Sequence, residues 1–214
     1  VGIAPMSRWE GAPKQMDPRY IMPNAKSMIV IANRINRGAL RGIEEGTHFS
    51  TYASMGYGAI NTVYLPNFII RFARIFEDEG YECVPFGFES VFGNNVDSWT
   101  LNETNDAPMF PTPRSKAVAP GKPLPDVLVH VRIAAYLAGL GEIGWSKVFL
   151  TPEFGPRQRF GMVFTEMELE PDPIYDGPPL CNRCMACAND CPGNAISTTK
   201  SVKVTLAGHE VEWG

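Results

Sequence analysis

Residues 181–192 read CNRCMACANDCP and contain four of the five cysteines in this chain of 214 residues. Their spacing is C-x2-C-x2-C-x3-C-P, which bacterial iron–sulfur loops use to bind [4Fe–4S] clusters. In such a loop the first three thiolates bind one cluster, and the fourth binds a neighbouring cluster. The spacing therefore predicts a redox protein in which Cys181, Cys184 and Cys187 share one cluster and Cys191 serves a second.

Two other interpretations of these cysteines are less favourable. Zinc ribbons also use C-x2-C pairs, but a longer segment separates their two pairs. Disulfide frameworks are typical of small secreted chains that cannot build a large core. Here the four thiols lie in one loop of a chain long enough to have a core of its own. An iron–sulfur loop also implies a reducing or anaerobic compartment.

The fifth cysteine, Cys83, lies about a hundred residues upstream, so this chain lacks the second loop that would complete two clusters. The chain begins at Val1 without Met and ends at Gly214, directly after an expected strand over residues 211–213. We therefore expect it to be the excised core of a longer protein.

The composition is that of an ordinary globular chain, with 44% hydrophobic and 20% charged residues. Its net charge is −4, and Lys and Arg do not cluster, so we expect no binding patch for nucleic acid or an anionic membrane. The sequence contains no apolar run of membrane-spanning length and no signal peptide. We expect a cytoplasmic protein, and a trimmed N-terminus would leave export open.

Apolar periodicity predicts an α/β core. Residues 28–33 form a continuous apolar run, typical of a strand buried on both faces. Ile69, Phe72, Ala73 and Phe76 repeat at helical spacing within a helical region over 49–79 that Pro66 divides. We also expect strands over 81–85, 147–150 and 159–165, a helix over 129–139, and a long connection over 87–125.

A proline-rich link at residues 170–173 separates this core from the cysteine loop. We therefore expect two units, an α/β core over 1–172 and a small cluster domain over 173–214.

Residues 138–172 read AGLGEIGWSKVFLTPEFGPRQRFGMVFTEMELEPD and precede the cysteine loop and its continuation GNAI. This combination resembles the reductive dehalogenase and epoxyqueuosine reductase superfamily, whose members are cobalamin-dependent iron–sulfur reductases. The turn at 138–141, the TPEFGP segment at 151–156 and the cysteine loop carry the resemblance together. It continues upstream in residues 1–4, 28–33 and 57–85.

The resemblance implies a nitroreductase-like core that binds a corrinoid (cobalamin), followed by a ferredoxin-like domain. Electrons from a donor such as a ferredoxin or flavodoxin would pass through two [4Fe–4S] clusters to form Co(I), which would reduce a small organic substrate. The three histidines, His48, His130 and His209, do not stand in the Asp-x-His-x-x-Gly pattern of histidine-ligated corrinoid proteins.

The resemblance also suggests residues that would bind the corrinoid. Gly139, Leu140 and Gly141 are candidates because a backbone without Cβ allows a large planar ligand to approach, although such glycines also cap helices. Gly155 and Pro156 have the same two interpretations. Trp145 stands where dehalogenases carry Arg and epoxyqueuosine reductases carry Lys. Lys147 could compensate for the lost cation, which would stabilise a leaving anion.

Three residues are candidates for the proton donor. Tyr57 and Tyr64 lie on the first helical stretch, where dehalogenases place their acid, and the alternative for each is a packed core tyrosine. Asp126 is the nearest match to the aspartate of epoxyqueuosine reductases, and its alternative is a helix N-cap. His130 could also act as an acid, or it could be structural.

A second function is compatible with the same features. The chain could belong to an electron-transfer or corrinoid-reactivating protein that delivers electrons to a partner's corrinoid and reduces no substrate itself. A proton donor that faces the corrinoid would distinguish the reductase.

Overall fold

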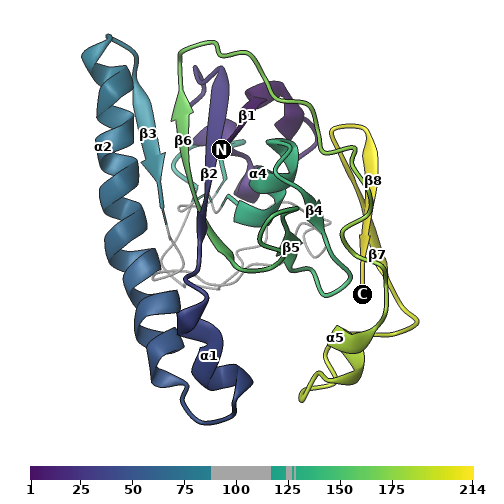
Figure 1. The fold of residues 1–214 in the computed structure, drawn as a ribbon. Helices are drawn as coiled ribbons and strands as arrows, with labels where there is room; N and C mark the ends of the chain where they lie inside the picture. The colour runs from purple at the N-terminus through teal and green to yellow at the C-terminus, as the bar shows by residue number, and fades with distance from the viewer. Residues whose placement is uncertain (88–116, 124–126, 128) are drawn as a thin grey trace.

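The computed structural model describes residues 1–87, 117–123, 127 and 129–214. Its centre is a four-stranded antiparallel sheet with the strand order β1-β2-β6-β3 (Figure 1). The strands are β1 (Gly2–Pro5), β2 (Ser27–Arg34), β6 (Gln158–Thr165) and β3 (Cys83–Phe86). β2 and β6 pair over their full length, from Ser27 opposite Thr165 to Arg34 opposite Gln158. They form the middle of the sheet.

Helices cover both faces of this sheet (Figure 1). On one face lie the π-helix η4 (Tyr52–Tyr64) and α2 (Leu65–Asp78), with α1 (Gly38–Glu44) beside η4 at the end of the sheet, and on the other face lies α4 (Val131–Leu137). Side chains alternate along β6 accordingly. Met162 and Phe164 pack in the main core with α4, whereas Val163 packs with Leu65 and Ile69 of α2. The result is a three-layer α/β fold.

Shorter elements complete the described part of the chain. Three 3-10 turns, η1 (Met6–Trp9), η2 (Lys14–Met16) and η3 (Pro18–Tyr20), lie between β1 and β2. After α4 come the β4–β5 hairpin (Glu142–Ile143 and Phe149–Leu150), the short helix α5 (Ala186–Asn189) and the β7–β8 hairpin (Val202–Leu206 and His209–Trp213). Leu206, Val211 and Trp213 pack into the main core.

Most predicted elements are present in the structure. The strands expected over 28–33 and 159–165 lie within β2 and β6, and the helical region over 49–79 contains η4 and α2 with Pro66 in the first turn of α2. The expected strand over 147–150 is wrong in its first half, because Lys147 has a φ of 61° and belongs to a turn. Most of the expected connection over 87–125 lies outside the described residues.

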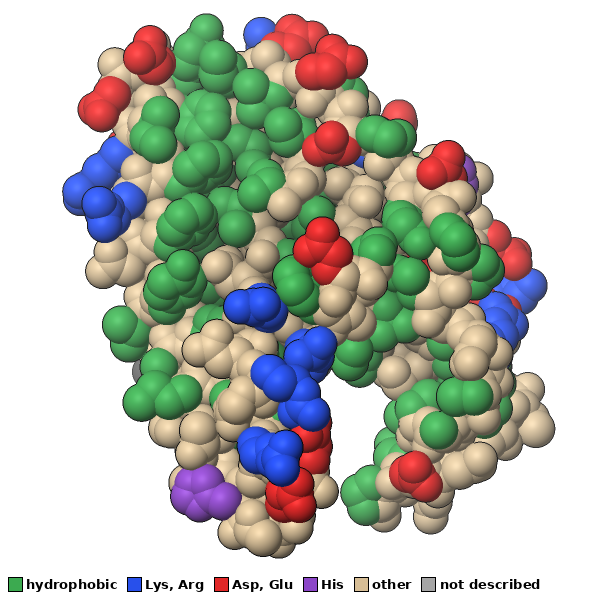
Figure 2. Space-filling model, in the orientation of Figure 1, with side chains coloured by type: hydrophobic (Ala, Val, Ile, Leu, Met, Phe, Trp, Pro, Cys, Tyr) green, Lys and Arg blue, Asp and Glu red, His purple; other side chains and the backbone are tan. Residues whose placement is uncertain are grey.

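The outer face of η4 and α2 is apolar and open to solvent. Figure 2 shows hydrophobic side chains gathered over these helices. Seven large hydrophobic side chains of these two helices are each at least 40% exposed: Met55, Tyr57, Val63, Tyr64, Phe68, Ile70 and Ile75. Among the described residues, we find no helix with the length and apolar character needed to cross a membrane.

Candidate functional site

The cysteine loop follows a tightly wound backbone path. Arg183 and Met185 both have left-handed conformations, with φ of 53° and 60°, and α5 begins directly after Met185. This path leaves Cys184 and Cys187 exposed, whereas Cys181 and Cys191 are half-buried. The loop therefore presents thiols at the surface, next to the rest of the fold.

Backbone N–H groups point at two of the four sulfur atoms. Trp145 donates its backbone N–H to Cys181 Sγ at 3.3 Å, and Ala195 donates to Cys191 Sγ at 3.4 Å. The N–H groups of Ala195 and Gly193 lower the pKa of the Cys191 thiol, because they stabilise its thiolate. Such N–H···S bonds also help to set the reduction potential of iron–sulfur clusters.

The donor set fits an iron–sulfur cluster by type, because it consists of thiols with N–H groups directed at them. The thiols are not gathered around one point. In the described part of the chain, no three His, Cys, Asp or Glu side chains lie close enough to hold a metal ion.

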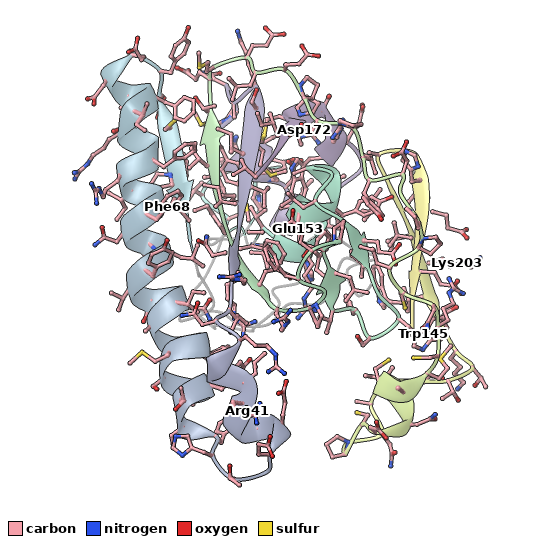
Figure 3. The ribbon with its side chains drawn as sticks, viewed as in Figure 1. Arg41, Phe68, Trp145, Glu153, Asp172 and Lys203 are labelled. Atoms are coloured by element: carbon pink, nitrogen blue, oxygen red, sulfur yellow. The ribbon has the colours of Figure 1, made fainter. Side chains whose placement is uncertain are left out.

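Trp145 connects the core to this loop. Its side chain is 6% exposed, and its indole Nε1–H donates to the carbonyl oxygen of Ser197 at 2.8 Å. Its own carbonyl accepts the N–H of Gly214 at 2.8 Å, and the Arg183 guanidinium lies 5.3 Å from its ring centre. In Figure 3, Trp145 lies where the C-terminal hairpin meets the cysteine loop. The indole N–H of Trp145 is therefore satisfied by the backbone of Ser197.

Two further contacts attach the same segment. The Glu142 carboxylate of β4 accepts the backbone N–H of Cys181, and Arg183 forms a 2.6 Å ion pair with Glu212 of β8. Sequence analysis identified neither acidic residue, because nothing near them in the sequence marks them as partners of the loop. Lys147 places its ammonium 4.7 Å from the ring centre of Trp213. Lys147 was expected to replace the cation that relatives carry at the position of Trp145. In the structure its ammonium instead makes a stabilising cation–π contact with Trp213.

The predicted corrinoid glycines occupy two kinds of environment. A Cβ on Gly139 would collide with the carbonyl oxygen of Pro173, and one on Gly141 would collide with that of Leu150. The close approach expected at these glycines is present, but its partner is the chain's own backbone, so they do not fit a corrin cradle. Leu140, between them, packs against the main core. Gly155 has a φ of 56° and open space where its Cβ would lie, so Gly155 and the exposed Pro156 remain accessible to a ligand.

The predicted acids lie on the other side of the sheet. Tyr57 and Tyr64 belong to η4 and are 45% and 57% exposed. Asp126 lies outside the described residues. His130 precedes α4, and its Nδ1 accepts the N–H of Ile133 at 3.4 Å, which supports the structural interpretation of this histidine.

The predicted site residues thus form two groups. The tyrosines lie on the α2 side of the sheet, whereas Trp145 and the cysteine loop lie on the α4 side. Figure 2 shows an open notch at the end of the molecule between α1 and the cysteine loop, and the wall on the α1 side carries Lys and Arg side chains together with Asp and Glu side chains.

Curated relatives share part of this sequence. The chain is 43% identical over 72 residues to a tetrachloroethene reductive dehalogenase of Desulfitobacterium hafniense, which covers 33% of this chain and 13% of the relative. It is 47% identical over 62 residues to the tetrachloroethene reductive dehalogenase of Sulfurospirillum multivorans, covering 28% and 12%. No family model matches the chain.

Solved structures share the fold over a longer stretch. A reductive dehalogenase described in connection with B12-dependent dehalogenation matches 98% of this chain and 25% of its own, with a TM-score of 0.58 and 19% identity. The catabolic reductive dehalogenase NpRdhA in complex with 3-bromo-4-hydroxybenzoic acid matches the same shares with a TM-score of 0.52 and 20% identity.

The fold is mixed α/β, and the cysteine loop carries two exposed and two half-buried thiols. The comparisons then confirm the resemblance predicted from the sequence: the chain is related to the reductive dehalogenase superfamily, whose named members are oxidoreductases. The chain spans about an eighth of the length of the curated relatives and a quarter of the length of the solved ones.

Proposed function

We propose that the chain is part of a cobalamin-dependent iron–sulfur reductase that acts on a small organic substrate, as a reductive dehalogenase or an epoxyqueuosine reductase does. One observation carries the proposal: a C-x2-C-x2-C-x3-C-P loop with N–H groups directed at Cys181 and Cys191 belongs to a fold shared with reductive dehalogenases over 98% of the chain.

The cysteine loop is the proposed electron entry. An external donor such as a ferredoxin or flavodoxin would reach the exposed side of the loop, where Cys184 and Cys187 are accessible. In the complete protein we propose two [4Fe–4S] clusters, with Cys191 serving the second. Trp145 and Glu142 would hold the loop at a fixed position relative to the core.

We propose a nitroreductase-like core over residues 1–172 and a ferredoxin-like unit over 173–214. The corrinoid, when bound, supplies the low-potential cobalt chemistry. Of the residues expected to contact it, Gly155 and Pro156 are the accessible ones, and exposed Tyr57 or Tyr64 could hold the proton for the substrate.

Anaerobic reconstitution of the protein with iron, sulfide and cobalamin tests this proposal. We expect a visible spectrum with both cluster and corrinoid bands, with one corrinoid retained per protein after gel filtration. A halogenated phenol should then lose halide in the presence of a strong reductant. A protein that builds its cluster but retains no corrinoid would contradict the reductase.

Two observations support the electron-transfer or reactivating alternative. Both proposed tyrosine acids lie across the sheet from the cysteine loop, and Gly139 and Gly141 face the chain's own backbone. Under this alternative the reduced protein would convert a partner's corrinoid to Co(I) and would release no halide by itself.

A further inference from the structure

The face of β6 that turns toward η4 carries a charged side chain. Val163 on this face packs with Leu65 and Ile69, and a Cβ on Gly161 would collide with Ile69. Arg159 lies two residues before Gly161 and therefore shares this face. Its guanidinium lies 5.1 Å from the ring centre of Tyr57 and 6.0 Å from that of Tyr52. Arg159 thus points into the space between η4 and the sheet.

Two asparagines lie beside Arg159. Asn33 of β2 is directly opposite Arg159 in the antiparallel ladder, and directly opposite residues project to the same face. Asn61 of η4 is 2% exposed and lies between Tyr57, which contacts Arg159, and Leu65, which faces Gly161. All three polar side chains therefore converge on one region between η4 and the sheet.

The three side chains carry donors without acceptors. Asn33 Nδ2, Asn61 Nδ2 and Arg159 Nε are buried and have no hydrogen-bond partner within the described chain. The guanidinium makes one hydrogen bond, from Nη2 to the Tyr52 hydroxyl at 2.7 Å, and forms no ion pair with any described carboxylate. Buried donors without acceptors are costly, and here one of them belongs to a half-buried cation that forms no ion pair with a described carboxylate.

The helix above this cluster is unusual as well. η4 has π-helical geometry over 13 residues, whereas π turns in proteins are mostly single and often mark functional sites. Asn61 is the polar residue that this helix buries, beside the small Gly56. This π-helical segment buries the amide of Asn61 above Arg159 with its Nδ2 donor unpartnered, which indicates a ligand there.

We propose that Asn33, Asn61 and Arg159 form a binding site for an oxyanion, namely the carboxylate or phosphate group of a small ligand. A planar guanidinium recognises such groups strongly, and two amide donors would complete the coordination of their oxygens. A water molecule could accept from these donors, but it would leave the charge of Arg159 uncompensated. Arg159 lies against Tyr57, one of the two proposed acids, but none of the three donor residues is assigned a role in the reductase, and anion binding is measured without turnover.

Anion binding to the purified protein tests the site. Inorganic phosphate and benzoate are titrated separately at constant ionic strength, and the melting temperature and the heat of binding are recorded. We expect saturable binding of at least one anion, and the one preferred distinguishes a phosphate source from a carboxylate source. Arg159→Gln should weaken binding at least tenfold. Arg34→Gln is the matched control, because exposed Arg34 is the next residue after Asn33 and projects to the opposite face of the sheet.

The Asn61→Asp variant provides a second test, because its expected effect is a gain in melting temperature and not a loss of anion binding. A carboxylate at this position would itself pair with Arg159, so we expect a higher melting temperature without anion and no further rise when anion is added. The proposal is overturned if neither anion binds, if Arg34→Gln weakens binding as much as Arg159→Gln, or if Asn61→Asp leaves the anion response unchanged.

Discussion

At the scale of single residues, Trp145 shows how the structure changes an interpretation. The sequence placed an indole where relatives carry a cation and predicted a site for a leaving anion. In the structure the indole is buried, and its only polar atom donates to Ser197. Its backbone N–H reaches Cys181 Sγ. The geometry therefore favours a role for Trp145 in holding the cysteine loop.

Trp145→Phe is expected to loosen the loop. The substitution removes the hydrogen bond to Ser197 while keeping an aromatic ring, so the loss should be about 1 kcal/mol from the bond, with a further contribution from the smaller ring. Limited proteolysis over residues 181–197 should accelerate. Trp9→Phe is the control, because Trp9 is fully buried in the main core and should alter global stability without a selective effect on the loop. Equal cleavage rates in both variants would contradict this role of Trp145.

Cys83 is expected to be the least reactive thiol in the metal-free protein. Burial raises the pKa of its thiol, and a hydrogen bond with Thr165 opposes this only in part. Less thiolate forms at pH 8, and the side chain is only 7% exposed, so alkylation by iodoacetamide should be slow and should accelerate as the pH rises. Timed mass spectrometry should show Cys184 and Cys187 labelled first. Rapid labelling of Cys83 at pH 8 without denaturant would show that the strand next to α2 opens readily.

At the scale of elements, the sequence predicted what local periodicity determines. The apolar run of β2 and the helical spacing of α2 were both correct, because each pattern matches the element that it forms. The π-helical geometry of η4 was not predicted, since its residues have no spacing that distinguishes a π-helix from an α-helix. The turn at Lys147 was missed because apolar residues follow it directly.

The glycines after α4 provide an element-scale prediction. Gly139→Ala should destabilise the protein by roughly 3 kcal/mol, since it combines a left-handed conformation with a collision against the Pro173 carbonyl. Gly11→Ala is a matched control: its φ of 83° is close to the 74° of Gly139, but its Cβ would meet nothing within 4 Å. It should cost about 1 kcal/mol. Urea unfolding measures both, and equal losses would show that the contact with Pro173 is unimportant.

At the scale of the whole molecule, contacts between distant segments could not be predicted. Glu142 and Cys181 are bonded across 39 positions, and Trp145 and Ser197 across 52. Likewise, the β7–β8 hairpin places Leu206 and Trp213 in the main core, although its sequence follows the cysteine loop. A local sequence pattern can identify a strand or a metal-binding loop. It does not determine which distant segment of the chain that strand or loop packs against. The cysteine loop could be recognised because its spacing is itself local, and the role of its thiols as cluster ligands stays a prediction.

The same arrangement predicts that cluster binding and core stability can be separated. The main core contains none of the loop cysteines, whereas Cys83 packs with Leu65, Ile69 and Val163 beneath α2. Cys184→Ser should therefore abolish the cluster of the reconstituted protein and leave its circular dichroism and melting temperature nearly unchanged.

Cys83→Ser should have the opposite effect. It places a hydroxyl beside Leu65, Ile69 and Val163, where Thr165 offers one hydrogen bond, and should lower stability by about 1 kcal/mol while the visible cluster spectrum persists. Iron and sulfide analysis together with thermal unfolding of both variants tests this separation. If Cys184→Ser retained full iron content, the ligand assignment would be wrong. If Cys83→Ser lost its cluster while still folded, Cys83 would be a ligand, and the separation of the α2 side of the sheet from the redox loop would have to be abandoned.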